Sequence, residues 1–211
     1  PGVRDEFLRV LTFWCERGVD GFRSEVSHGL AKDRREPLRD RIDPTLMSPQ
    51  ATDGSDPLWD RDAVHDIYRE WRDLFNQYTP AKYAVGESWS PFTTRIFQYA
   101  KPDELGAVFD FSMSKAAWNR EEYRTTIERT HRYALAAETA PTWVLGNHDQ
   151  SRIASRLGAA QARVATMLLY TLRGTPTRYY GDEIGMANVK IPRELMRDPQ
   201  FVNQPELPPE V

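Results

Sequence analysis

Three short stretches decide the fold of this chain: Gly21-Phe22-Arg23-Ser24-Glu25, Val85-Gly86-Glu87-Ser88-Trp89 and Gly146-Asn147-His148-Asp149. Each stretch places a carboxylate at the end of a predicted β-strand, and helical patterns separate the strands. Strands that alternate with helices indicate a parallel α/β sheet. Because the carboxyl ends of parallel strands meet on one face, the sequence predicts a site that gathers these carboxylates.

Five strands alternate with helices along the chain. Apolar residues at helical spacing predict helices over residues 1–17, 60–78, 93–100, 119–137 and 160–172. Asp60 is the predicted cap of the second helix. Short apolar runs predict strands over residues 19–26, 82–89, 107–113, 142–147 and 176–180. Residues 33–58 and the segment after 186 are predicted loops, and five strands are too few for a closed eight-stranded barrel.

Composition excludes several classes of protein. The chain has 211 residues, of which 40% are hydrophobic and 28% charged, as in an ordinary globular domain. A net charge of -3 leaves no basic excess for nucleic acid. No apolar run approaches the roughly 20 residues that cross a membrane. The chain shows no signal peptide, so we expect a cytoplasmic location, although Pro1 is not a natural start.

Two glutamates are candidates for acid/base chemistry. Side chains alternate along a strand, so Arg23 and Glu25 share a face and Arg23 can hold Glu25 ionised. Glu87 follows a glycine and precedes Trp89, and apolar surroundings would raise its pKa as a general acid requires. Taken singly, Glu25 is better explained by a solvated ion pair and Glu87 by an ordinary loop glutamate.

The doublet His148-Asp149 allows two functional interpretations. A His-Asp doublet occurs in metal-dependent phosphohydrolases, but the four histidines of this chain lack metal-ligand spacing. The alternative is that His148 and Asp149 hydrogen-bond to sugar hydroxyls, with Arg152 forming an ion pair with Asp149. We therefore predict no metal and no cofactor.

Taken in order, these stretches resemble the conserved regions of the α-amylase/α-glucosidase family of retaining glycoside hydrolases. Residues 26–32 and the run from Leu172 through Tyr180-Gly181-Asp182-Glu183 to Met186 add to the resemblance, and the second is similar to the last barrel strand of oligo-1,6-glucosidase-like members. The resemblance implies a partial (β/α)8 TIM barrel, roughly strands four to eight. Residues 1–211 would then be a fragment of the catalytic domain without strands one to three or the C-terminal β domain.

The resemblance also implies roles for individual residues. Glu25 would be the nucleophile, Glu87 the general acid and Asp149 the carboxylate that stabilises the transition state. In such retaining enzymes the two main carboxyl groups lie ~5–5.5 Å apart. The implied substrate is an α-linked gluco-oligosaccharide.

Sugar-binding roles fall to four further residues. Arg23 and His148 match family residues that orient the nucleophile and bind sugar. Arg152 lies three residues after Asp149, which the resemblance places in the sugar pocket. His28, just past the first strand, is placed to contact a leaving-group sugar, although the start of a surface helix explains it equally well.

The chain departs from the family pattern at the nucleophile. The family has aspartate where this chain has Glu25, and a displacement of ~1 Å can cost ~100-fold in rate. Ser24 and Ser27 replace residues that are usually apolar or alanine, and an unpaired buried Ser24 hydroxyl would cost roughly 1–3 kcal/mol. We therefore expect impaired catalysis.

Three functions fit these observations: a retaining α-glucosidase, a transglycosylating or trehalose synthase-like relative, and a non-catalytic binding or assembly subunit like the transporter heavy chains. Glu25 favours the third, whereas the retained Glu87 and Asp149 favour the first two. An open barrel edge near residues 19–26 would invite self-association.

Overall fold

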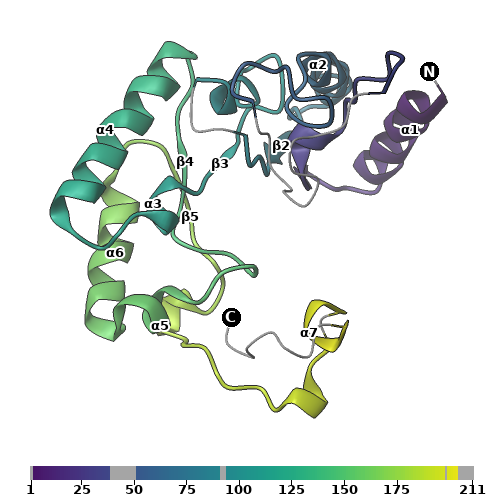
Figure 1. Ribbon diagram of the computed structural model, residues 1–211. Coiled ribbons are helices and arrows are strands. Elements are labelled where there is room, and N and C mark those ends of the chain that lie inside the picture. The colour runs from purple at the N-terminus through teal and green to yellow at the C-terminus, as the bar shows by residue number, and fades with distance from the viewer. Residues whose placement is uncertain (1, 39–50, 91–93, 198, 204–211) are drawn as a thin grey trace. The chain divides into compact units, whose positions relative to one another are not determined.

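The computed structural model describes residues 2–38, 51–90, 94–197 and 199–203 (Figure 1). They form two compact units, which are described separately below. The first unit comprises Pro1–Asp110 and Arg124–Thr142, and the second comprises Phe111–Tyr123 and Trp143–Val211. Of the predicted features, Pro1 and residues 39–50 of the predicted loop lie outside the described residues.

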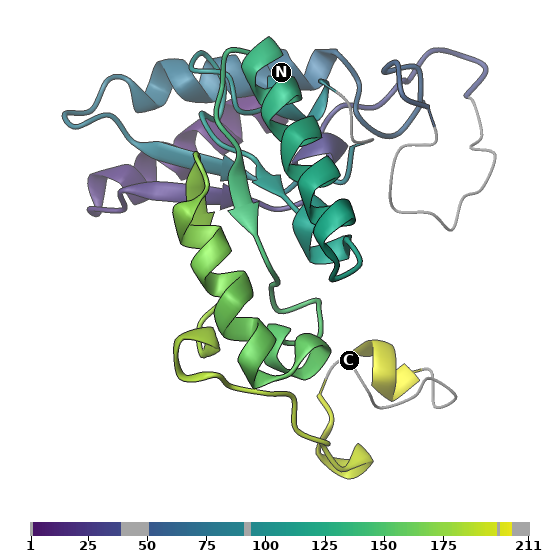
Figure 2. The same ribbon diagram turned by 90° about the vertical axis from the view of Figure 1, so that its left-hand side faces the viewer.

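The first unit is built on two parallel strands. β1 (Gly21–Ser24) pairs with β2 (Tyr83–Gly86) so that Gly21 faces Tyr83 and Ser24 faces Gly86. The strands run side by side in both ribbon views (Figure 2). A Cβ added at Gly21 would lie 2.6 Å from the Tyr83 carbonyl oxygen, so this close approach requires glycine. Gly86 also forms a parallel bridge to Val108.

Two amphipathic helices cover these strands. α1 (Gly2–Glu16) buries Leu11 and Cys15, and α2 (Ala63–Phe75) buries one full face. Phe22 of β1 stacks on Phe75 of α2 with ring centroids 5.5 Å apart. The core of the unit is this cluster of buried residues: Leu11, Cys15, Val64, Tyr68, Trp71, Phe75, Ala84, Ile96, Phe97, Tyr99, Ala100, Leu105, Val108, Ala134 and Ala137.

The remaining elements are short, apart from two helices. The first unit also holds η1 (Ser27–Gly29), η2 (Ile96–Gln98) and β3 (Phe109–Asp110), while α4 (Arg120–Ala136) belongs to both units. The second unit holds α3 (Ser112–Lys115), β4 (Thr142–Val144, entering at Trp143), α5 (Ile153–Leu157), α6 (Ala159–Thr171), β5 (Thr175–Thr177), η3 (Asp182–Ile184), η4 (Arg193–Leu195) and α7 (Pro199–Asn203).

In the second unit β4 lies next to β5. Trp143 is fully buried, and its indole nitrogen donates to the Arg173 carbonyl oxygen over 2.9 Å. Arg156 of α5 donates to the carbonyl oxygens of Ser114 and Leu145, which fastens α3 to the end of β4. One partly buried arginine thus stabilises the segment that leads to residues 146–149.

The alternating pattern of the sequence is confirmed in outline. Helices predicted over 1–17, 60–78, 119–137 and 160–172 appear as α1, α2, α4 and α6. Four of the five predicted strands contain a shorter observed strand, and the fifth, predicted over 176–180, overlaps β5 (Thr175–Thr177) by two residues. The predicted strand over 107–113 is partly wrong, because the chain turns into α3 at Ser112. The predicted cap is also wrong, because Asp62 rather than Asp60 precedes α2 and makes no side-chain capping bond.

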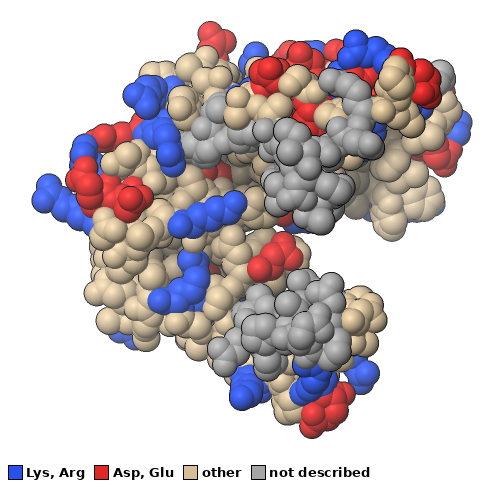
Figure 3. All heavy atoms as spheres, viewed as in Figure 1, with Lys and Arg blue, Asp and Glu red and all other residues tan. Residues whose placement is uncertain are grey.

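The space-filling view (Figure 3) shows charges of both signs on one face of the molecule. In the face shown in Figure 3, acidic and basic side chains are interspersed, which agrees with the small net charge of -3. Within the described residues, no helix is both long and apolar enough to cross a membrane.

Candidate active site

Glu25 and Glu87 are the residues that directly follow two paired strands. Ser24 and Gly86 end β1 and β2 opposite each other, so the next residue on each strand is a glutamate. The Glu87 amide donates to the Ser24 carbonyl oxygen over 2.9 Å and continues the parallel pairing by one residue. The register of the sheet therefore brings the two predicted catalytic carboxylates to adjacent positions.

Arg23 binds both carboxylates. Its Nη1 pairs with Oε2 of Glu25, and its Nη2 lies 3.0 Å from Oε2 of Glu87. The predicted Arg23–Glu25 pair is thus confirmed, and the second pair with Glu87 is an addition that strand alternation alone did not suggest. A guanidinium has donors on two arms, so one side chain can orient both acids.

The two carboxylates have different surroundings. The Glu25 side chain is 61% exposed, whereas Glu87 is 1% exposed. Burial raises the pKa of Glu87 above its ordinary value, the nearby Arg23 guanidinium opposes that rise, and the neighbouring Glu25 carboxylate adds to it. A raised carboxyl pKa suits a general acid.

The turn after β1 is fixed by the residues around Glu87. Val26 adopts a left-handed conformation with a φ of 44°. This turn directs both the amide and the hydroxyl of Ser27 to the Glu87 carbonyl oxygen, at 2.7 and 2.8 Å. Tyr68 of α2 in turn donates to the Ser27 carbonyl oxygen over 2.5 Å. These bonds hold the Glu87 backbone in one position.

Ser24, which stands where the family resemblance implies an apolar residue, has a hydrogen-bond partner. Ser24 Oγ lies 3.4 Å from the Tyr68 hydroxyl. The cost of an unpaired hydroxyl at Ser24 therefore does not arise, because α2 brings a tyrosine hydroxyl to this position.

Gly86 leaves no room for a side chain. A Cβ at this position would lie 2.8 Å from Leu105 Cδ1 and 3.0 Å from Ser27 Oγ. Because Leu105 and Ser27 are both fully buried, neither can move into open space. The glycine before Glu87 is thus needed for packing.

His28 is buried behind the acids. The ring is fully buried, its Nδ1 lies 3.4 Å from the Trp89 amide as the acceptor, and its centroid lies 5.1 Å from that of Trp59. In this arrangement His28 holds the segment after Glu87 against Trp59. Its contact with a leaving-group sugar stays a prediction.

The third of the three carboxylate-bearing stretches, residues 146–149, lies in the second unit, in a turn after β4. The Asn147 amide group donates to Asp149 Oδ2 over 3.1 Å, and the Asp149 amide donates to Asn147 Oδ1 over 3.1 Å. His148 Nε2 lies 3.3 Å from Asp149 Oδ1, and both side chains are exposed. The turn thus holds the His148–Asp149 pair toward solvent.

Arg152 does not pair with Asp149 as predicted. Its guanidinium lies 3.6 Å from Asp182 Oδ1, donates to the Tyr180 carbonyl oxygen over 2.7 Å and packs on the rings of Tyr179 and Tyr180. The motif around Asp182 attracts this arginine because it offers both a carboxylate and aromatic surface.

Sequence reasoning missed two sets of residues that support the site. Asp60 is fully buried, and its carboxylate accepts hydrogen bonds from Arg95 Nε over 2.7 Å and from the Tyr99 hydroxyl over 2.6 Å. Arg72 donates to the carbonyl oxygens of Lys82, Glu104 and Leu105 at 2.6–2.9 Å. These partners are far apart in sequence, so no local pattern indicates them. In the described ranges no three His, Cys, Asp or Glu side chains are grouped as a metal site.

Residues 1–206 match the family "Alpha amylase, catalytic domain". An alpha-glucosidase of Apis mellifera is 30% identical over 207 residues, which are 95% of this chain and 35% of the relative. The human amino acid transporter heavy chain SLC3A1 is 32% identical over 204 residues, covering 90% of this chain and 29% of the relative. A solved alpha-glucosyl transfer enzyme, XgtA, superposes with a TM-score of 0.77 at 25% identity, over 95% of this chain and 40% of that one.

The chain therefore spans about a third of the length of these curated relatives. The predicted resemblance is confirmed over nearly all of its residues, and the family implies a (β/α)8 barrel of which the parallel strands seen here are a part. The chain belongs to the alpha-amylase catalytic-domain family.

Proposed function

We propose that the protein containing this chain is a retaining α-glucosidase of reduced activity, in which this chain supplies strands four to eight of the catalytic barrel. The observation that carries the proposal is the shared Arg23: it binds an exposed Glu25 and a buried Glu87 at the ends of two paired strands. Paired carboxyl groups in unlike surroundings are what a double displacement requires.

The mechanism assigns one role to each glutamate. The Glu25 carboxylate attacks the anomeric carbon while the glycosidic bond breaks, and Glu87 gives its proton to the leaving oxygen. Water then attacks the glycosyl ester, Glu87 takes the water proton, and the bond to Glu25 breaks. The raised pKa of Glu87 supports the first step, and its pairing with Arg23 supports the ionised form in the second.

Substrate contacts belong to the same proposal. Asp149 would stabilise positive charge on the sugar, with His148 beside it and Arg23 orienting Glu25. The exposed position of the His148–Asp149 pair supports a hydroxyl-binding role. The implied substrate is a short α-linked gluco-oligosaccharide in a cytoplasmic enzyme, and an alpha-glucosidase is among the relatives at 30% identity.

Two alternatives rest on specific observations. Similarity to an alpha-glucosyl transfer enzyme favours transfer to a second sugar instead of to water. Glu25 in the nucleophile position, together with similarity to a transporter heavy chain, favours a non-catalytic subunit.

The test is a product analysis with maltose and the full protein. A retaining hydrolase releases glucose first as the α-anomer, which proton NMR detects before mutarotation, and E87Q abolishes the release. Longer oligosaccharides as the main product would favour transfer. No turnover by the protein or by its E25D variant would overturn both catalytic proposals.

A further inference from the structure

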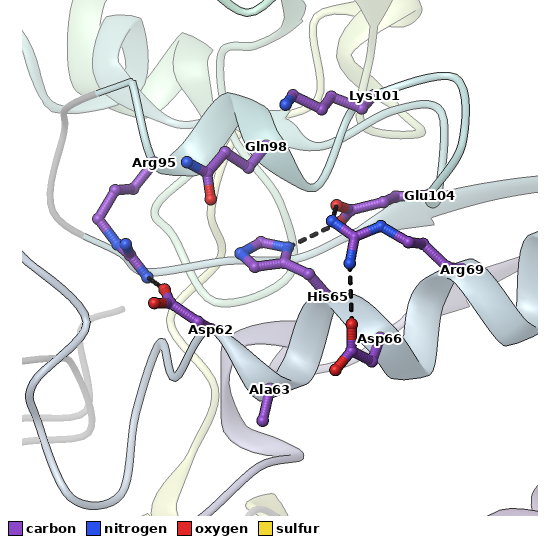
Figure 4. A pocket seen from close by; sticks show the side chains of 9 residues that line it. All are labelled: Asp62, Ala63, His65, Asp66, Arg69, Arg95, Gln98, Lys101 and Glu104. Carbon is purple, nitrogen blue, oxygen red and sulfur yellow. Dashed lines mark hydrogen bonds and ion pairs between the residues drawn. The ribbon is translucent and has the colours of Figure 1, made fainter.

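One pocket in the first unit is separate from the two glutamates. It has a volume of about 610 Å³ and lies between the N-terminal turn of α2 and residues 95–104 (Figure 4). Arg23, Glu25 and Glu87 do not line it. Nearly all of its lining is polar or charged, so it does not resemble a gap in the apolar core.

The floor of the pocket is a buried histidine. His65 is 4% exposed, and its Nδ1 lies 2.7 Å from Oε2 of the buried Glu104, whose Oε1 accepts from Arg69 over 3.2 Å. An ionised carboxylate has no hydrogen to give, so Nδ1 is the donor. In the tautomer that donates from Nδ1, the ring carries a lone pair at Nε2 on its other side.

That lone pair has no partner among the described residues. His65 Nε2 is buried and makes no hydrogen bond within the described part of the chain. In Figure 4 the side of the ring away from Glu104 faces the space beside Gln98 and Arg95. Buried polar atoms nearly always have a partner, so Nε2 indicates a missing hydrogen-bond donor.

The walls of the pocket carry balanced charge. Arg95 pairs with Asp62 at 2.9 Å as well as with Asp60 at 2.7 Å. Arg69 pairs with Asp66 at 2.9 Å as well as with Glu104 at 3.2 Å. Lys101 makes no ion pair with any residue that the structure describes. The lining includes three acids and three Lys or Arg residues, and this balance favours a neutral ligand over an anion.

We propose that this pocket binds a neutral saccharide as a second, non-catalytic site. One sugar hydroxyl donates to His65 Nε2, and neighbouring hydroxyls accept from Lys101 and the Gln98 amide. Glu104 is a positioning residue, because it fixes the tautomer that exposes the Nε2 lone pair. The proposal does not depend on hydrolysis at Glu25 and Glu87.

The experiment follows the ring nitrogens of His65 by NMR in the full protein labelled with ¹⁵N-histidine. D-glucose and inorganic phosphate are the two probes. We expect the Nε2 signal to shift saturably with glucose and to stay in place with phosphate. A shift with phosphate alone would overturn the proposal in favour of an anion site, and no shift with glucose would overturn it altogether.

Two variants separate binding from folding. His65→Asn keeps a donor near the Nδ1 position for Glu104 but removes Nε2. In this variant the protein is labelled uniformly with ¹⁵N, and the Gln98 side-chain amide signal reports binding. Lys101→Met removes the ammonium group, and its glucose binding is measured from the shift of the His65 Nε2 signal. Each should weaken glucose binding about tenfold, the effect of one hydrogen bond. Unchanged affinity in both variants would overturn the proposal.

Matched controls lie outside the pocket. His131→Asn and Lys190→Met should leave glucose binding at wild-type strength. Maltose hydrolysis, measured separately, should be the same in His65→Asn as in wild type, so loss of pocket binding is distinguishable from failure of the proposed function. Loss of glucose binding in E87Q instead would assign the signal to the catalytic site and overturn the proposal.

Discussion

Arg23 Nη2 lies 3.0 Å from the buried Glu87 carboxylate while Nη1 of the same guanidinium pairs with Glu25. One guanidinium thus forms ion pairs with two carboxylates, one exposed to solvent and one in the protein interior. A bidentate donor can do this because its two arms are rigidly spaced, which a lysine cannot reproduce.

Arg23→Met should shift the pH dependence of the reaction. Arg23 lowers the pKa of Glu87, so its removal lets that pKa rise further. A general acid is active while protonated, so the alkaline limb of kcat/KM should move to higher pH, with lower activity throughout. Arg4→Met, which breaks an exposed ion pair with Glu70, is the control and should leave the limb in place. A limb that moves to lower pH would contradict this account.

Glu87→Gln should stabilise the fold at neutral pH. The pKa of Glu87 is higher in the folded than in the unfolded state, so stability falls as pH rises from about 4.3 through the folded pKa. The glutamine variant should therefore have a higher Tm than wild type at pH 7, and the difference should vanish near pH 4. Glu70→Gln at an exposed pair serves as the control. A lower Tm at pH 7 would show that Arg23 outweighs burial.

Gly86→Ala should disturb both stability and the position of Glu87. The new methyl group would lie 2.8 Å from Leu105 Cδ1, and overpacking of a filled core costs about 1–3 kcal/mol. Chemical denaturation measures this loss. Gly2→Ala, where nothing lies within 4 Å of the added Cβ, should be neutral or slightly stabilising. Equal stabilities of the two variants would mean that the strand end relaxes freely.

Tyr68→Phe should destabilise the turn behind Glu87. The variant leaves the buried Ser27 carbonyl without the 2.5 Å bond from Tyr68, at a cost of about 1–2 kcal/mol in the free energy of unfolding. Tyr83→Phe is the matched control, because Tyr83 is exposed. A loss below that of the control would show that the hydroxyl does not support the turn.

Much of the site could be predicted because its determinants are local. The glutamates follow strands whose register is set by short apolar runs, and Arg23 and Glu25 are two residues apart on one strand face. Helices with regular apolar spacing, such as α2, were found at nearly their observed bounds.

The rest depends on partners that are distant in sequence. Asp60 is drawn away from α2 by Arg95 and Tyr99, which lie 35 and 39 residues further on. Arg152 pairs with Asp182 rather than with the nearby Asp149, and the rings of Tyr179 and Tyr180 pack on its guanidinium there. Local sequence spacing does not predict these hydrogen-bond and ion-pair partners, because tertiary packing determines them.

The most direct test of the central claim is the kcat/KM of Glu25→Asp in the full protein with maltose. If Glu25 and Glu87 form a retaining pair that the extra methylene of Glu25 impairs, aspartate should raise kcat/KM by about 100-fold, and adding E87Q should abolish the gain. An unchanged or lower kcat/KM in Glu25→Asp would contradict the claim that Glu25 occupies the position of the nucleophile.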